Sequence, residues 1–406
     1  MPTQATRRVQ TASSAAPSPK GMRRPPLAVI DLFCGGGGVS QGVREANTWG
    51  RALAVLAVDA DKHALAHHAR QFPRATHLLL AMGTDTEQEL LAAVSATLAR
   101  LPSRVHIHLH GSPPCQGFSM VNTRCTKRNA VAKVKNNNLS VWFLQVVPKI
   151  RKLVDAAAFA GFSWSYENVE RALPWLHETC TTELKRARHT VTAVVRASEL
   201  GGATLRTRVF LGDGWIVPVP THTEAMATTA AQVLGVPSTW AINNATLRSK
   251  IKRDSATGIV GRVRDAMGNL IDIDHSTGQG LVPCNRPYQA LLTGGTPIAL
   301  WRPVRRGTAW RRVRSLTAVD LAKLQGFPPS FVDNLSFTRA RKLIGNSVPP
   351  AMFAALLDAI GAPQPRCAHC GAPRWHGRLD GQLVCKRHSD AVPPRKRKFG
   401  FSGGLR

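Results

Sequence analysis

The feature that most constrains the fold is an alternation of short apolar runs with helical stretches near the N-terminus. Apolar runs at residues 27–33, 52–58 and 105–110 predict buried strands, and stretches around residues 65–72 and 87–101 have helical spacing. Strands that alternate with helices form parallel sheets joined by right-handed crossovers. We therefore expect an α/β protein with a doubly wound, mostly parallel sheet.

Changes in composition along the chain predict how it divides into domains. Residues 1–26 contain no acidic residue and no hydrophobic periodicity, which predicts a disordered basic arm, although a mitochondrial transit peptide would have a similar composition. Residues 27–211 carry the α/β pattern, whereas residues 212–312 are richer in Gly, Thr, Pro and Arg and predict a smaller, irregular domain. The α/β pattern returns over residues 313–361, and residues 362–406 form an appendage.

Two helices are expected where the α/β pattern returns. Thr317 can cap the first helix, and Gly326 ends it. The second follows a double proline, runs over residues 351–360 and closes the fold.

The charge balance indicates a polyanionic partner. The 406 residues include 54 Lys and Arg against 24 Asp and Glu, a formal net charge of +30. Such a field attracts phosphates, so nucleic acid is the expected partner, although a GC-rich genome that favours Arg codons would also raise the charge. We expect no membrane association, because no apolar stretch is long enough to span one. The eight cysteines are too dispersed for a disulfide framework, which predicts a reducing, cytoplasmic compartment.

A glycine run after the first predicted strand indicates a cofactor site. Gly35, Gly36, Gly37 and Gly38 would let the backbone turn sharply and approach a ligand closely. Asp59 ends the next strand, about 20 residues later, where an acid commonly binds ribose hydroxyls. Together they predict a nucleoside cofactor, with a flexible turn and a surface acid as the alternative.

A cysteine, a glutamate and two arginines are candidates for the chemistry. Cys115 follows a strand and a double proline, so it could be a fixed nucleophile that adds to an electron-poor ring carbon, or a small apolar filler. Glu167 ends another apolar run and could be a general acid or a solvated residue at a helix start. Arg206 and Arg208 share one face of a predicted strand and suit an anionic or carbonyl-rich ligand, or simply keep an edge strand soluble.

The order of these motifs resembles that of the DNA (cytosine-5) methyltransferase family. The matching pieces are Asp-Leu-Phe-Cys-Gly-Gly-Gly-Gly at 31–38, Pro-Pro-Cys-Gln-Gly-Phe-Ser at 113–119, Glu-Asn-Val at 167–169, Arg-Thr-Arg at 206–208, Leu-Gln-Gly-Phe-Pro at 324–328 and Ile-Gly-Asn-Ser-Val-Pro-Pro at 344–350. The resemblance spans about residues 27–361. It implies a Rossmann-like fold. It also implies an enzyme that transfers a methyl group from S-adenosylmethionine to C5 of cytosine in a specific sequence of double-stranded DNA.

The resemblance also implies a role for each matching residue. Cys115 would attack C6 of a flipped-out cytosine, and Glu167 would engage the N3 and amino edge. Arg208, with Arg206 nearby, would reach the base carbonyl and orient the glutamate. The residues matched to DNA contact are Gln116 and Ser119, and those matched to the cofactor are Phe33, Gly35, Gly36, Gly37, Gly38, Asp59, Pro114, Leu139, Asn346 and Ser347.

Two positions depart from the family pattern. Thr204 stands where the arginine motif usually opens with Gln. The acid that contacts the adenine amino group is not clearly placed, and Asp85 is a candidate, with a helix N-cap as the alternative.

Residues 212–312 lie where the family has its target-recognition region, and they are rich in Lys and Arg that suit guanine edges and phosphates.

We expect a monomer of bacterial or phage origin that associates with the nucleoid through DNA, with a cognate restriction endonuclease as a candidate partner. The alternatives are a tRNA cytosine-5 methyltransferase, a non-catalytic DNA-binding relative, and an enzyme acting on a free pyrimidine monophosphate.

Four residues near the C-terminus have the spacing of a small zinc knuckle. They are Cys367, Cys370, Cys385 and His388, in two pairs separated by 14 residues. Four protein ligands leave no open position, so the zinc would be structural or help to bind DNA. Reduced cysteines without metal are the alternative.

Overall fold

The computed structural model describes residues 24–46, 52–115, 118, 127–243, 259–261, 281–291, 293, 298–304, 309–362, 377–379 and 382–384. Within these ranges, no helix is both long and apolar enough to cross a membrane.

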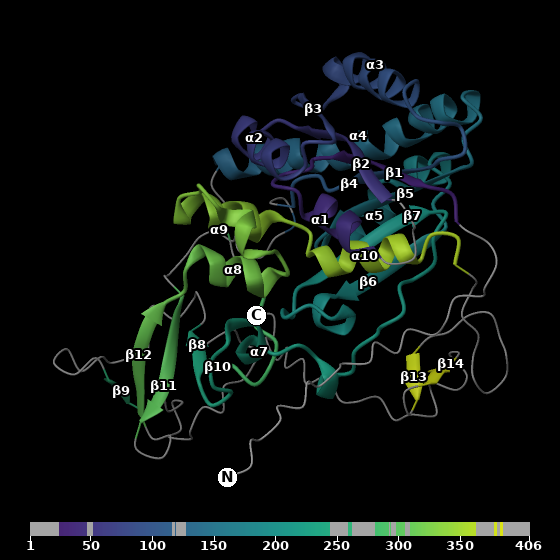
Figure 1. Cartoon of the computed structure of the whole chain (residues 1–406). Helices are drawn as coiled ribbons and strands as arrows, with labels where there is room; N and C mark the ends of the chain where they lie inside the picture. The colour runs from purple at the N-terminus through teal and green to yellow at the C-terminus, as the bar shows by residue number, and fades with distance from the viewer. Residues whose placement is uncertain are drawn as a thin grey trace, which may run out of the picture.

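A seven-stranded sheet lies at the centre, with its strands in the order β3-β2-β1-β4-β5-β7-β6 (Figure 1). Each pairing from β3 through to β5 is parallel, whereas β7 is antiparallel to both β5 and β6. The predicted doubly wound, mostly parallel sheet is therefore confirmed. The strands are β1 (Leu27–Leu32), β2 (Ala52–Asp59), β3 (Thr76–Leu79), β4 (His106–Gly111), β5 (Gly161–Asn168), β6 (Val191–Arg196) and β7 (Thr207–Asp213).

Helices cover both faces of this sheet, because the side chains of each strand alternate between the faces. On β1, Ala28, Ile30 and Leu32 join a buried cluster with α3, α4, α5 and α6. Leu27 and Val29 point the other way and join a cluster with α1 and α10. These helices are α1 (Gly38–Glu45), α3 (Glu87–Leu98), α4 (Lys127–Ala156), α5 (Ala172–Thr179), α6 (Thr181–Arg186) and α10 (Pro350–Asp358); α2 (Lys62–Gln71) packs near β2 and β3.

Helix α10 brings the C-terminal part of the chain against the first helix, as the expected closing helix should. Its observed bounds, Pro350–Asp358, lie close to the predicted 351–360. The two helices approach closely because α1 has a glycine at the contact. A Cβ on Gly42 would lie 2.8 Å from the Pro350 carbonyl oxygen and 2.9 Å from the Phe353 Cβ.

The turn from β1 into α1 requires a glycine for a different reason. Gly37 caps α1 with a φ of 104°, a left-handed conformation that residues with a Cβ rarely adopt. A Cβ there would also lie 2.3 Å from the Phe72 ring. The glycine run is thus fitted between α2 and the end of β1, which fixes the loop that a ligand would meet.

A second sheet of five antiparallel strands lies in the part of the chain that was expected to be irregular. Its order is β10-β8-β11-β12-β9. It shares a buried cluster with the helices α7, α8 and α9 and the turn η4. The elements are β8 (Ala241–Asn243), β9 (Ile259–Gly261), β10 (Leu281–Pro283), β11 (Ala299–Val304), β12 (Ala309–Ser315), α7 (Ala230–Leu234), α8 (Ala318–Gln325), α9 (Phe337–Asn346) and η4 (Pro329–Val332).

The caps predicted for α8 are confirmed. The Thr317 hydroxyl accepts a hydrogen bond from the Asp320 backbone N–H, and the Asp320 carboxylate accepts one from the Thr317 N–H. Gly326 ends the helix with a φ of 93°. The remaining short elements are η1 (Thr84–Thr86), η2 (Ala197–Leu200), η3 (Glu224–Met226), β13 (Gly377–Leu379) and β14 (Gln382–Val384).

The contact between α1 and α10 can be tested by adding one methyl group. Gly42→Ala should lower the free energy of unfolding by about 1–3 kcal/mol, because overpacking outweighs the better helix propensity of Ala. Gly83→Ala is the control, since a Cβ at Gly83 has no neighbour within 4 Å. Urea denaturation should show no more than about 0.5 kcal/mol of change for the control. Equal stabilities of the two variants would contradict the contact.

Candidate active site

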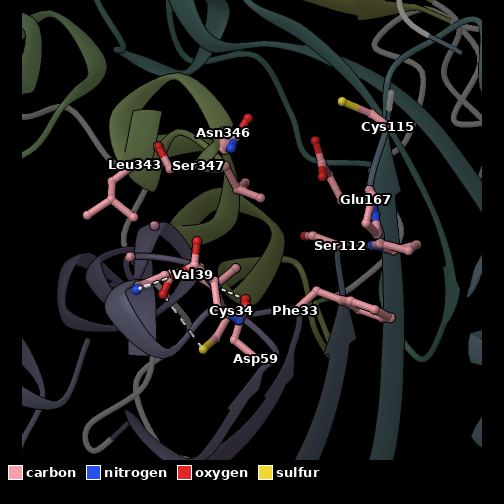
Figure 2. A pocket seen from close by; sticks show the side chains of 18 of the residues that line it. Phe33, Cys34, Val39, Asp59, Ser112, Cys115, Glu167, Leu343, Asn346 and Ser347 are labelled. Atoms are coloured by element: carbon pink, nitrogen blue, oxygen red, sulfur yellow. Dashed lines mark hydrogen bonds between the residues drawn. The ribbon is translucent and has the colours of Figure 1, made fainter. Parts of the chain in front are cut away.

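A cavity of about 350 Å³ opens at the carboxyl ends of β1, β2, β4 and β5 (Figure 2). Doubly wound sheets bind their ligands at this edge. The segment between α9 and α10 forms the facing wall, so Asn346 and Ser347 lie across from Cys115 and Glu167 (Figure 2). The predicted site residues that line the cavity are Phe33, Gly35, Gly36, Gly38, Asp59, Pro114, Cys115, Leu139, Glu167, Arg206, Arg208, Asn346 and Ser347.

The remaining predicted residues do not line this cavity or lie outside the described ranges. Gly37 shapes the turn beneath the loop and is not part of the lining. The predicted DNA contacts and zinc ligands fall outside the described residues; they are Gln116, Ser119, Cys367, Cys370, Cys385 and His388. Within the described ranges, no group of three or more His, Cys, Asp or Glu could hold a metal ion.

Asp59 ties the glycine loop to the end of the neighbouring strand. Its carboxylate accepts hydrogen bonds of 2.8 Å from the backbone N–H groups of Gly35 and Asp61. Burial raises the pKa of Asp59 above its ordinary value, and these hydrogen bonds act in the opposite direction. Asp59 therefore both fixes the loop and presents a carboxyl to the cavity.

The glycine loop lies directly against the end of α9 and the segment that joins α9 to α10. A Cβ on Gly36 would lie 3.3 Å from Leu343, and one on Gly38 would lie 2.3 Å from the Val348 carbonyl oxygen. A side chain at Gly38 would collide with backbone, whereas one at Gly36 would make a tight contact with the Leu343 side chain. The contact closes the cavity with a segment about 300 residues away in the sequence.

Glu167 and Arg208 form a buried ion pair at the other end of the cavity. Arg208 Nε lies 2.8 Å from Glu167 Oε1, and their side chains are only 12% and 8% exposed. Arg206, just before β7, is also buried, and its Nε has no hydrogen-bond partner within the described residues. Burial and the nearby Arg208 lower the pKa of Arg206 to about 9, so it remains a cation at neutral pH. The cluster thus carries a net positive charge.

Cys115 lies in a loop that is tied to β5. The Asn168 side-chain amide donates to the Pro113 carbonyl oxygen at 3.4 Å, and the Phe118 N–H donates to the Cys115 carbonyl oxygen at 2.9 Å. Burial raises the pKa of the Cys115 thiol above its ordinary value of 9.0, and Glu167 raises it further. The positive charges of Arg208 and Arg206 act against this rise.

Several lining residues were not predicted. Asp61 follows Asp59 by two positions and caps α2, so its N-cap pattern was visible in the sequence. Leu343 and Val348 also line the cavity, and only the folded chain brings them there. Ser112 lines it as well, and it directly follows the strand that precedes Cys115. Additional unpredicted lining residues are Cys34, Val39, Ala60, Ala64, Ala81, Met82, Pro113, Lys342 and Gly345.

The structure does not place Asp85 in the cavity, so that candidate is wrong for this conformation. Asp85 is exposed in η1, while Ala81 and Met82 line the cavity instead. The alternative prediction, that Asp85 caps a helix, is also wrong, because the N-cap residue of α3 is Thr86. Thr204 is buried and forms a backbone bridge with Tyr288, so it supports the loop before β7.

Comparison with known proteins identifies the family. A model of the C-5 cytosine-specific DNA methylase family matches residues 27–212 and 231–362. Because this match covers most of the chain, the protein belongs to the C-5 cytosine-specific DNA methylases, and membership implies S-adenosylmethionine as methyl donor. The Type II methyltransferase M1.HphI of Haemophilus parahaemolyticus is 27% identical over 352 residues, which cover 82% of this chain and 86% of the relative.

Solved structures show the same fold at low sequence identity. The S. pombe Dnmt2 methyltransferase is 16% identical with a TM-score of 0.52, covering 82% of this chain and 98% of its own. A protein described as a DNA modification methyltransferase encoded within an E. coli prophage is 19% identical with a TM-score of 0.51, covering 83% and 100%. The expected methyltransferase fold class is thus confirmed.

The electrostatics around Cys115 predict how its reactivity depends on pH. The thiolate is the reacting species, and the raised pKa means that alkylation by iodoacetamide should keep accelerating as the pH rises past 9. At pH 8, Glu167→Gln should react about threefold faster because it removes a charge that raises the pKa, and Arg208→Gln should react more slowly. Mass spectrometry of the peptide with Cys115 gives the rates. A plateau below pH 9 would contradict the assignment.

Proposed function

We propose that the protein methylates C5 of cytosine in double-stranded DNA, through a covalent bond between Cys115 Sγ and C6 of a flipped-out base. The observation that supports this best is the single cavity shared by Cys115, the Glu167–Arg208 pair, the glycine loop and Asp59. A nucleophile, a carboxyl and a cofactor loop around one cavity are the parts that methylation of an inactive ring carbon requires.

Cys115 and Glu167 would divide the activation of the base between them. C5 of cytosine is a poor nucleophile until a thiolate adds to C6 and a hydrogen bond or proton at N3 stabilises the resulting charge. Arg208 fixes the direction of the Glu167 carboxyl through their 2.8 Å contact. Arg208 and Arg206 favour the thiolate of Cys115, which partly offsets the effect of burial. Loss of the C5 proton and departure of Cys115 would then restore the aromatic ring.

The glycine-lined end of the cavity fits S-adenosylmethionine. When bound, this cofactor supplies an electrophilic methyl group. Asp59 would hold the ribose hydroxyls, and a Cβ at Gly35 would have no protein atom within 4 Å, so this part of the loop leaves open space for a ligand. Asn346 and Ser347, on the facing wall, would hold the methionine end. Phe33, Pro114 and Leu139 line the same cavity.

The surface of the second sheet favours DNA as the substrate. Arg302 and Arg311 are directly opposite each other on β11 and β12, and both are exposed, as is Arg312. Like charges at paired positions are unfavourable alone, so this arrangement suits a polyanion. Phosphate contacts would offset the few kcal/mol needed to flip a base. The Type II methyltransferase of Haemophilus parahaemolyticus, as a relative, also favours DNA and a place in a restriction–modification system. The protein would act as a monomer.

The proposed nucleophile can be tested by one substitution. Cys115→Ser should lower methyl transfer by at least about 10³-fold, because a serine hydroxyl without an activating base is a weak nucleophile. Tritiated S-adenosylmethionine with duplex DNA or tRNA measures the transfer, and calorimetry should show cofactor binding within about threefold of wild type. Full activity of Cys115→Ser would exclude the covalent mechanism. Preferential methylation of tRNA would exclude DNA as the main substrate.

The proposed ribose contact predicts a selective loss of affinity. Asp59→Ala should weaken S-adenosylmethionine binding by about 10- to 100-fold, because it removes charged hydrogen bonds to the ligand and to the loop. Asp85→Ala is the matched control and should bind normally, since Asp85 is exposed and does not line the cavity. Isothermal titration calorimetry measures both variants. A larger effect at Asp85 would reverse the assignment.

A further inference from the structure

A continuous chain of hydrogen bonds runs along the sheet between β4 and β5. His106 Nε2 and His108 Nδ1 each lie 2.8 Å from Ser163 Oγ. His108 Nε2 and His110 Nδ1 lie 2.9 and 2.7 Å from Ser165 Oγ. The pairing of the two strands sets His108 opposite Ser163 and His110 opposite Ser165, whereas His106 is opposite Gly161. Each serine hydroxyl therefore also reaches a second ring two residues along β4, His106 or His108, and bridges two rings.

One end of this chain reaches the cavity. His110 Nε2 lies 2.7 Å from Ser112 Oγ, and Ser112 lines the cavity on the same wall as Glu167 (Figure 2). Ser112 is three residues before Cys115. The other end is His106, which is partly exposed at the opposite edge of the sheet. The chain therefore spans the length of β4, about 17 Å.

The middle of this hydrogen-bond chain is closed to solvent. His108, His110, Ser163 and Ser165 are fully buried, and the Phe353 ring of α10 packs against both of these histidines. Burial lowers the pKa of His110 to about 3 and that of His106 to about 4, and it lowers the pKa of His108 as well. All three rings are therefore neutral at neutral pH.

Because the rings are neutral, the direction in which the hydrogen bonds of the chain donate can be reversed. A neutral imidazole donates from one nitrogen and accepts at the other, and a hydroxyl both donates and accepts. The five hydrogen bonds can therefore all point from Ser112 towards His106, or all point the other way. Moving one proton across each bond converts one arrangement into the other, which is the property of a proton relay.

The proposed reaction produces a proton that must leave the closed site. Each turnover converts a sulfonium cation into a neutral thioether and replaces the C5 hydrogen by a methyl group, so one proton is released. The electron pair of the C5–H bond becomes part of the C5–C6 double bond while the bond from C6 to Cys115 Sγ breaks. A chain of hydrogen bonds that begins at the cavity wall would offer this proton a route.

We propose that the chain from Ser112 to His106 carries the C5 proton out of the active site. This inference rests on the proposed function. The proton reaches Ser112 through water in the cavity, and the Ser112 hydroxyl proton passes to His110 Nε2. Each later group gains one proton and gives up one, until His106 releases a proton at the far edge of the sheet. His106, His108, His110, Ser163 and Ser165 touch no reactant and act only through Ser112.

Removal of a hydroxyl far from the cavity tests the relay. Ser163→Ala and Ser165→Ala each break the chain, and neither residue lines the cavity. Each should lower kcat by about fivefold with an unchanged KM for S-adenosylmethionine. Because loss of the C5 proton would be slowed, the covalent protein–DNA adduct on unmodified cytosine should accumulate severalfold, as an SDS-stable band. Ser163→Thr, which keeps the hydroxyl, should restore the wild-type rate and band.

A matched control separates the relay from a purely structural role. Thr97→Val removes a buried hydroxyl that donates to the Ala93 carbonyl oxygen in α3, away from the chain. It should lower stability without adduct accumulation. Wild-type turnover by both Ser163→Ala and Ser165→Ala, or slower turnover without extra adduct, would overturn the relay. Failure of wild-type protein to methylate DNA or tRNA would instead remove the proposed function and the relay together.

Discussion

The contact between the glycine loop and the segment that joins α9 and α10 is the constraint on which the site depends. Gly36 lies against Leu343, where a Cβ would be tight, and Gly38 lies against the Val348 carbonyl oxygen, where a Cβ has no room. This contact attaches the last part of the α/β pattern to the first and forms the wall that faces Cys115 (Figure 2). Without it, the carboxyl end of the sheet would be an open edge rather than a cavity.

Much of the catalytic part could be predicted because its signals are local. The strands, the caps of α8 at Thr317 and Gly326, and the order of the motifs are read directly along the chain. The antiparallel position of β7 between β5 and β6 could not be predicted, because hydrophobic periodicity is the same in parallel and antiparallel neighbours. The second sheet was missed because β8, β9 and β10 have three residues each, too few to establish a period.

The site residues likewise divide into those that local sequence predicts and those that depend on tertiary packing. Cys115 and Glu167 lie at the carboxyl ends of strands and could be predicted from those ends, whereas Leu343 and Val348 reach the cavity only through the packing of distant segments. Asp85 was a wrong candidate because an acid at a helix start can be recognised without knowing which way it faces. The histidines of β4 were visible as an alternation, but their serine partners on β5 depend on strand register.

The charges of the site favour an anionic partner. Two buried arginines face a single buried glutamate, so one positive charge is left uncompensated. Burying an uncompensated charge is costly unless a partner of opposite sign arrives. A thiolate or a DNA phosphate would provide that partner. The free protein thus carries the unfavourable free energy of a buried, uncompensated positive charge, which an anionic substrate would reduce on binding.

The protonation state of Cys115 also affects how readily its sulfur is oxidised. Peroxide oxidises thiolates to sulfenic acid far faster than it oxidises thiols. Since burial keeps the pKa of Cys115 above its ordinary value, the resting side chain is mostly a thiol at neutral pH. The same desolvation that would slow the proposed attack on a base therefore protects the sulfur from oxidative damage.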